Sequence, residues 1–315
     1  MTAARVIAIF AEAGVPAGVL NMVVGSGDDV GDELVENPGT RAVSFTGSNE
    51  VGVRVYASSA RGMKKCQCEM GGKNPAIVLA DADLAMTAKA IVGAAFDVTG
   101  QRCTATSRVI VEDSVADELV GLLTGLARKW RVGNGLNAAT DMGPLVDENQ
   151  LATVLRYIEI GKKEARLVIG GQRLSGAAYD KGHFVAPTIF DDVPWDSTIA
   201  QEEIFGPVLS VIRVTDFEEA LRVANSVRYG LAGSIYTNDS AKSFAFIDRI
   251  EVGMAHVNSP TFANEVQMPF GGLKGAGAGL REQGRVAIDF FTDLKSVYID
   301  YSGVYAGRKR GSNDE

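Results

Sequence analysis

Apolar stretches of two kinds alternate along the chain. Some repeat every three or four residues, as the buried face of a helix does, and others are short unbroken runs that suit buried strands. The first kind predicts helices over residues 2–13, 50–61, 84–96, 115–130 and 150–165. The second kind predicts strands over residues 19–24, 42–45, 63–69, 76–80, 107–111, 208–214 and 233–236. Strands that alternate with helices favour an α/β fold with a parallel sheet.

Two segments near the end of the chain depart from this alternation. Residues 270–279 hold five glycines in ten positions, which predicts a loop packed against a ligand or another stretch of backbone. Residues 293–300 form a late apolar run without a neighbouring strand in the sequence. We expect this run to be an edge strand that pairs with another subunit. Between the two halves of the chain, Gly71-Gly72 is the best place for a boundary.

The length, charge and composition of the chain exclude several classes of function. A length of 315 residues suggests two domains of ordinary size. The net charge of −8 and the absence of a long basic stripe argue against nucleic acid as a partner. No apolar run reaches the roughly 18 residues of a membrane span. Three cysteines and two histidines argue against a disulfide scaffold and a histidine-based metal site, and they favour the cytoplasm.

Two side chains are candidates for covalent chemistry. Cys103 follows a predicted helix and is flanked by glycine and small polar residues, a setting in which a thiolate can act as a nucleophile. Glu69 ends a predicted strand just before two glycines, so its carboxylate would face the ligand crevice of a parallel sheet. Taken alone, the local context favours an inert buried thiol for Cys103 and a solvated charge at the strand end for Glu69. Cys66 and Cys68 share the other face of this strand as core thiols.

Two further segments suit a nucleotide, and a third does not. The turn from Phe45 to Ser48 leads from a strand into a helix, where backbone N–H groups bind anions, although Ser48 also suits an ordinary helix cap. Glu203 can accept hydrogen bonds from two ribose hydroxyls, and Phe205 can lie against a nicotinamide ring. The glycine-rich turn at 25–31 is one residue longer than the dinucleotide fingerprint and does not match it.

Five motifs, taken in order, resemble the aldehyde dehydrogenase superfamily across nearly the whole chain. The separation of Glu69 and Cys103 also matches the family pattern. The resemblance implies an incomplete Rossmann-type cofactor domain joined to an α/β catalytic domain. The motifs are SFTGS at 44–48, EMGGKNP at 69–75, GQRCTA at 100–105, EEIFGPV at 202–208 and PFGGLKGAG at 269–277.

The resemblance also implies a division of the chain. Residues 1–71 would be the C-terminal part of the NAD-binding domain, 72–271 the catalytic domain, 272–302 a return segment with the oligomerisation strand, and 303–315 a polar tail. Family members begin well upstream of Met1. That upstream part would carry the first strands of the cofactor sheet, a lysine for the adenosine ribose and an asparagine of the oxyanion site. We therefore expect a truncated or mis-started chain that performs the family chemistry poorly alone.

The resemblance assigns roles to single residues. Cys103 would attack an aldehyde carbonyl, and Glu69 would activate the water that hydrolyses the resulting thioester. NAD would accept the hydride, with NADP as the alternative. Gln150 would lie near the cofactor, but Thr153 stands where the family has a basic residue. The residues implied to bind the cofactor are Phe45, Gly47, Ser48, Val51, Gly71, Glu203 and Phe205.

Residues 100–111 and 256–261 look most like the branch that oxidises semialdehydes such as α-ketoglutarate semialdehyde. The implied partners are an aldehyde substrate and further copies of the chain, joined through residues 293–300. Two other function classes stay open: an inactive binding or scaffold protein that keeps the fold, and a thiol esterase that needs no cofactor. Family members that pass the thioester to coenzyme A usually lack the glutamate found here at Glu69.

Overall fold

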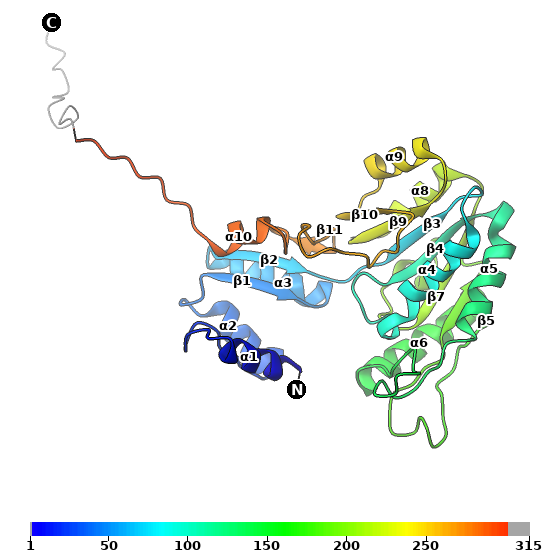
Figure 1. The fold of residues 1–315 in the computed structure, drawn as a ribbon, viewed down its shortest axis with the longest axis horizontal. Coiled ribbons are helices and arrows are strands. Elements are labelled where there is room, and N and C mark those ends of the chain that lie inside the picture. Colours follow the sequence, from blue (N-terminus) through cyan, green and yellow to red (C-terminus); the bar gives the residue numbers. More distant parts are fainter. Residues whose placement is uncertain (1, 302–315) are drawn as a thin grey trace, which may run out of the picture.

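The computed structural model describes residues 2–301, which fold around two sheets (Figure 1). A three-stranded sheet lies beside a seven-stranded one, and the chain first passes from one to the other at Gly71–Gly72. This passage falls where the sequence predicts a boundary, and a division into domains there stays a prediction. The polar tail predicted at 303–315 lies outside the described residues.

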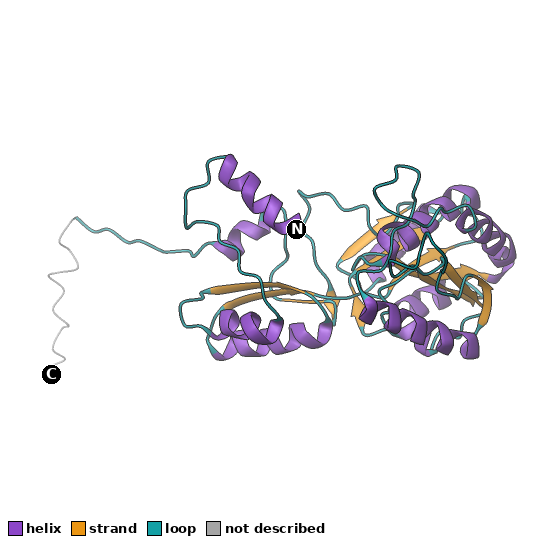
Figure 2. Ribbon diagram, turned by 90° about the horizontal axis from the view of Figure 1, so that it is seen from below, coloured by secondary structure: helices purple, strands orange, loops and turns teal. Residues whose placement is uncertain are grey.

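The small sheet is built around one crossover. β1 (Ala42–Thr46) and β2 (Lys65–Glu69) run parallel, and α3 (Asn49–Arg61) joins them. Ser48 begins the helix because its hydroxyl accepts a hydrogen bond from the Val51 N–H at 3.3 Å. α3 packs against both strands (Figure 2). The N-terminus of α3 therefore stands at the carboxyl end of β1.

The segment predicted to be a glycine-rich loop closes this sheet on the other side. β12 (Gly277–Ala278) pairs antiparallel with β2. A Cβ atom at Gly279, where φ is +82°, would clash with the carbonyl oxygen of Cys66. The loop packs against another backbone, as the sequence predicts, and no side chain fits at that point. Next to it, β11 (Leu273–Lys274) pairs with β8 (Tyr229–Gly230).

The large sheet has the strand order β10-β9-β3-β4-β7-β6-β5, and β5 alone is antiparallel to its neighbour. Such a sheet is covered on both faces, so its strands are almost continuously apolar. Its strands are β3 (Asn74–Val78), β4 (Thr106–Glu112), β5 (Arg166–Ile169), β6 (Thr188–Asp191), β7 (Val208–Val214), β9 (Ala232–Tyr236) and β10 (Met254–Val257).

Successive side chains of each strand point to opposite faces of the large sheet, so the hydrophobic core forms one cluster on each face. Val109 and Val111 pack with side chains of α4 (Leu84–Phe96) and α5 (Asp113–Ala127). Ile110 points the other way, into a cluster with side chains of four further helices, and the result is a three-layer α/β/α sandwich (Figure 2). Those helices are α6 (Glu148–Glu164), α7 (Thr198–Gln201), α8 (Phe217–Asn225) and α9 (Ser240–Arg249).

Shorter helices complete the described chain. α1 (Thr2–Glu12) confirms the first predicted helix, although all its side chains are at least partly exposed. The 3-10 turn η2 (Asp97–Gly100) directly continues α4. None of the helices in residues 2–301 is both long and apolar enough to cross a membrane. The other short helices are the π-helix η1 (Gly27–Gly31), α2 (Asp32–Glu36) and α10 (Val286–Phe291).

The strand predicted at 19–24 is wrong, whereas the edge strand predicted at 293–300 would form against another subunit and stays a prediction. Both segments are irregular, with Val24 83% and Leu294 102% exposed. A strand must satisfy its N–H and C=O groups on a neighbour, and no described strand lies against either segment. Beyond α10 the chain runs away from both sheets (Figure 1). The remaining predicted helices and strands are confirmed, with ends displaced by a few residues.

The central strand provides a test of this core. Ile110→Ala should lower the free energy of unfolding by about 3–4 kcal/mol, because it leaves a cavity between β4 and α8. Urea unfolding followed by circular dichroism measures the change. The control is Ile247→Ala on α9, where the side chain is half exposed and the loss should stay below about 1 kcal/mol. Equal losses in both variants would contradict this packing.

Candidate active site

Residues from distant parts of the sequence line one cavity of about 440 Å³ beside the passage between the sheets. The carboxyl ends of β1 and β2 reach it, as does the loop before β4, so it lies at the sheet edge where ligands bind in α/β folds. Cys103 and Glu69, the two candidates for covalent chemistry, both line this cavity. Its lining comprises Thr46, Gly47, Ser48, Glu69, Met70, Gly71, Cys103, Gln150, Thr153, Glu203, Ile204 and Phe205.

The loop that carries Cys103 begins in an uncommon backbone conformation. Val98, Thr99 and Gly100 all have positive φ angles, of 53°, 60° and 65°. A Cβ atom at Gly100 would also clash with the carbonyl of Gly206, so a glycine is needed there for two reasons. The Thr99 hydroxyl donates to the carbonyl of Gly143 at 3.1 Å. Left-handed residues of this kind cluster at functional sites, where the surrounding structure holds them.

The Cys103 thiol is half-buried, and burial raises its pKa. The carboxylates of Glu203 and Glu69 raise the pKa further, because they repel a thiolate. The backbone N–H of Thr104 opposes both effects by donating to the sulfur. In the protein by itself, the net effect is therefore a raised pKa of the Cys103 thiol. A ligand that brings positive charge into the cavity would favour the thiolate.

Glu69 is buried, with 3% of its surface exposed, and its pKa is raised to about 8. Burial is the main cause and the nearby Glu282 adds to it, whereas Arg281 and the Gly272 amide act in the opposite direction. Its Oε2 atom has no hydrogen-bond partner among the described residues. A carboxyl group that titrates close to neutral pH is suited to general-base catalysis.

The Glu203 carboxylate is held at the passage between the sheets. Its Oε1 accepts a hydrogen bond from the Gly72 N–H at 2.9 Å. A Cβ atom at Gly71 would clash with both carboxylate oxygens, so Gly71 provides the space in which Glu203 lies. Burial raises the pKa of Glu203, while the Gly72 N–H and the positive charge of Lys73 lower it. One carboxylate oxygen remains to accept hydrogen bonds from a ligand.

Phe205 lies on the cavity wall with a φ of 54° and 38% of its surface exposed. The side-chain amide of Gln150 donates to the carbonyls of Ile204 and Phe205, both at 2.9 Å. Gln150 thus lines the cavity and also fixes the backbone that presents Phe205. Thr153 lines the same wall, which keeps that side of the cavity uncharged.

Two of the predicted cofactor residues do not line the cavity. The Phe45 ring packs beneath Gly47, where a Cβ atom would clash with it. Val51 contributes its backbone N–H to the Ser48 cap, and its side chain is exposed. Both residues therefore shape the turn between β1 and α3. A direct cofactor contact for either stays a prediction.

Sequence reasoning missed Lys73, although it lies inside a recognised motif. Its side chain is fully buried, and its Nζ has no hydrogen-bond partner within residues 2–301. Burial lowers its pKa to about 7, with Arg108 adding to the effect and Glu203 opposing it. The signal was available in the sequence, since a lysine directly before a buried strand is uncommon.

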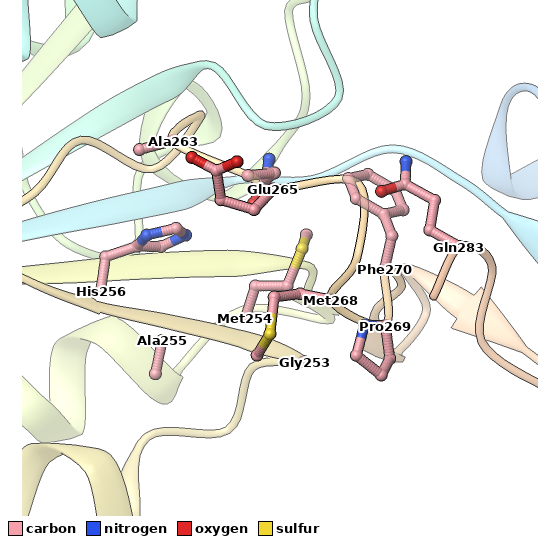
Figure 3. A pocket seen from close by; sticks show the side chains of 11 residues that line it. Gly253, Met254, Ala255, His256, Ala263, Glu265, Met268, Pro269, Phe270 and Gln283 are labelled. Atoms are coloured by element: carbon pink, nitrogen blue, oxygen red, sulfur yellow. The ribbon is translucent and has the colours of Figure 1, made fainter. Parts of the chain in front are cut away.

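A second cavity of about 310 Å³ lies beside β10, and Figure 3 shows His256, Glu265, Met254 and Met268 around it. Neither Cys103 nor Glu69 lines this cavity. The buried Nε2 atom of His256 has no partner in the described part of the chain. No group of three or more His, Cys, Asp or Glu side chains in residues 2–301 could hold a metal ion.

The electrostatics of the first cavity can be tested without a substrate. Glu69→Gln and Glu203→Gln each remove a negative charge that raises the pKa of Cys103, so each should speed its alkylation by iodoacetamide at pH 8. Mass spectrometry of the peptide that contains Cys103 gives the rate. Glu265→Gln, in the second cavity, is the control and should leave the rate unchanged. Equal rates in all four proteins would rule out this coupling.

The chain has clear relatives among known proteins. The sequence pattern of the aldehyde dehydrogenase family matches residues 1–297. An alpha-ketoglutaric semialdehyde dehydrogenase of Bacillus subtilis is 48% identical over 301 residues, which are 95% of this chain and 62% of the relative. An alpha-ketoglutarate semialdehyde dehydrogenase of Haloferax volcanii is 47% identical over 92% of this chain and 60% of its own length. The chain thus spans about 60% of these relatives.

Solved structures agree with the sequence relatives. An NAD-dependent aldehyde dehydrogenase from Sinorhizobium meliloti superposes with a TM-score of 0.92 at 36% identity, covering 99% of this chain and 60% of the other. A 1-pyrroline-5-carboxylate dehydrogenase from Thermus, solved with bound NAD, gives 0.89 at 40% identity over 93% and 57%. The α/β fold and the resemblance inferred from the five motifs are confirmed. This chain belongs to the aldehyde dehydrogenase family.

Proposed function

We propose that this chain carries the catalytic centre of an enzyme that oxidises an aldehyde to a carboxylic acid with NAD. The observation that carries the proposal is the single cavity onto which Cys103, Glu69, Glu203 and the N-terminal turn of α3 all open. A nucleophile and a base of raised pKa thus lie beside groups suited to a nucleotide. The activity, the substrate and the partners of the whole protein rest on this arrangement and on the family.

The residues supply a covalent route. The Cys103 thiolate forms a C–S bond to the aldehyde carbon, and the backbone N–H of Cys103 stabilises the oxyanion of the thiohemiacetal. When bound, NAD would supply the hydride acceptor that leaves a thioester on Cys103. Glu69 then takes a proton from water, the hydroxide forms the new C–O bond, and the C–S bond breaks to release the acid and the thiolate.

The cavity walls fit a dinucleotide. The Ser48 hydroxyl accepts from Val51, which leaves its own hydrogen to donate, and the first N–H groups of α3 face the same turn. A pyrophosphate would bind there. Glu203 would accept from the ribose in the space beside Gly71, and Phe205 would lie against the nicotinamide. NAD is favoured over NADP because three related structures are described with bound NAD.

The substrate we propose is a semialdehyde with a distant carboxylate, of the α-ketoglutarate semialdehyde type. Two of the relatives carry that name. Arg102 directly precedes the nucleophile in the sequence, but it does not line the cavity of Cys103, and its guanidinium is paired with Asp97 at 3.2 Å. The names of the relatives therefore carry this assignment. A scaffold protein would not need a tuned Glu69, and an esterase would need no nucleotide groups.

Formation of NADH tests the proposal. The 315-residue chain should reduce NAD with α-ketoglutarate semialdehyde faster than with propanal, and Cys103→Ser should abolish the reaction because it removes the nucleophile. Glu69→Gln should slow turnover by about 10²-fold or more while still forming the thioester. Wild-type turnover should rise with pH through about 8, as Glu69 loses its proton. Faster reduction of NADP would reverse the cofactor assignment.

Two results would count against the proposal. A chain that is folded by circular dichroism and forms no NADH with either α-ketoglutarate semialdehyde or propanal would contradict it. Ester hydrolysis that needs Cys103 and no NAD would favour the esterase instead. A cytoplasmic location also stays a prediction, favoured by three cysteines without disulfides and checked by cell fractionation.

Residues 293–300 supply the proposed contact between copies of the chain. Val297, Ile299 and Leu294 are exposed here, and β10 is an edge strand of the large sheet. If the segment pairs as a strand, Val297 and Ile299 share one face. Val297→Asp with Ile299→Asp should then reduce the mass measured by light scattering, and Ser296→Asp on the other face should not. An unchanged mass in the double variant would remove this role.

A further inference from the structure

Four consecutive carbonyl groups of the nucleophile loop are all engaged. The carbonyl of Arg102 accepts from the backbone N–H of Ala105 at 3.0 Å, within a tight turn. The next three carbonyls accept from side chains of other elements. Asn74 donates to the carbonyls of Cys103 and Ala105, both at 2.8 Å, and Thr261 donates to that of Thr104 at 2.7 Å.

The two donors are themselves buried and held. Asn74 is 2% exposed and Thr261 fully buried. Both amide hydrogens of Asn74 are used on the loop, and its oxygen accepts from the Ala232 N–H at 3.1 Å, which ties the loop to β9. Thr261 has one hydroxyl hydrogen and donates it to a carbonyl, so Thr106, at 2.8 Å, must donate to Thr261. All the proton positions in this cluster are therefore determined.

Fixing the carbonyls also fixes the amides. In a trans peptide the C=O and the following N–H point in opposite directions. The Cys103 carbonyl faces Asn74, so the N–H of Thr104 must point away from it, toward the sulfur, to which it donates. The same reasoning holds for the Arg102 carbonyl and the N–H of Cys103. The N–H groups of Thr104 and Cys103 are thus oriented by the hydrogen bonds that the carbonyl oxygens of the same peptides accept.

Gly72 shows how closely these parts fit. A Cβ atom there would lie 2.9 Å from the Cys103 carbonyl oxygen and 2.8 Å from the side-chain oxygen of Asn74. The Gly72 N–H meanwhile donates to Glu203. The short segment from Gly71 to Asn74 therefore contacts the carboxylate proposed for the ribose on one side and the nucleophile loop on the other.

We propose that Asn74 and Thr261 are positioning residues, which hold the loop carbonyls so that the N–H groups of Thr104 and Cys103 face the sulfur and stabilise its thiolate: Asn74 acts on the peptide of the Thr104 N–H, and Thr261 acts through the Ala105 N–H on the peptide of the Cys103 N–H. The proposal deepens the proposed function and rests on it for the role of Cys103 in catalysis. The geometry of the loop does not depend on NAD or on an aldehyde, so it can be measured separately.

The test is the pH profile of Cys103 alkylation by iodoacetamide, followed on the 315-residue chain by mass spectrometry. Asn74→Ala and Thr261→Val should each move the midpoint of the profile upward by about one pH unit. Asn74→Ala releases the Cys103 carbonyl and with it the N–H of Thr104, whereas Thr261→Val releases the peptide of the Ala105 N–H, whose bond to the Arg102 carbonyl orients the N–H of Cys103. Thr106→Val is the matched control. It removes a buried hydroxyl of the same cluster but releases no loop carbonyl, so the midpoint should stay.

Each outcome of the alkylation experiment either supports or overturns the positioning role of Asn74 and Thr261. A midpoint that is unchanged in folded Thr261→Val, or that moves equally in Thr106→Val, means that the cluster only stabilises the fold and overturns the proposal. If Asn74→Ala does not fold, Thr261→Val carries the test. If the wild-type chain forms NADH, Thr261→Val should lower kcat about tenfold with little change in KM. If it forms none, the proposed function fails while the thiol profile still decides on the positioning role.

Discussion

The structure depends on a close approach that side chains would prevent. At Gly71 and Gly72 the chain leaves β2 for β3, and the Glu203 carboxylate and the Cys103 carbonyl occupy the space where side chains would be. Both sheets, the nucleophile loop and the proposed ribose ligand meet at these two residues. Any larger residue would separate groups that have to share one cavity. The glycines are thus what allows the three-stranded and seven-stranded sheets to form one site.

The cavity concentrates groups that prefer to be neutral. Glu69, Glu203 and Cys103 all have raised pKa values, with burial as the first cause in each case. The negative charges of Glu69 and Glu203 raise the pKa of Cys103, so these three groups do not ionise independently. A cationic ligand would stabilise all the charged forms together. Binding of such a ligand and activation of the nucleophile are therefore coupled by electrostatics.

Much of the fold and the chemical core of the site could be predicted from the sequence. Periodicity located β4, β7 and α4 because these elements are buried on predictable faces. It failed at 19–24, since apolarity alone does not supply a neighbouring strand. The placement of Cys103 and Glu69 on one cavity agrees with the ordered motifs. Asn74 and Thr261 could not be foreseen, because their partners are backbone carbonyls far away in the sequence.

The left-handed run before Cys103 has a consequence for how this chain can change over evolutionary time. Val98 and Thr99 are β-branched residues at positive φ, a conformation that asparagine or glycine adopts at lower cost. Substitutions to those residues would relieve strain and make the chain more stable, yet they would also free a loop that is now stiff. Selection for stability and selection for a well-placed sulfur therefore act in opposite directions on these two positions.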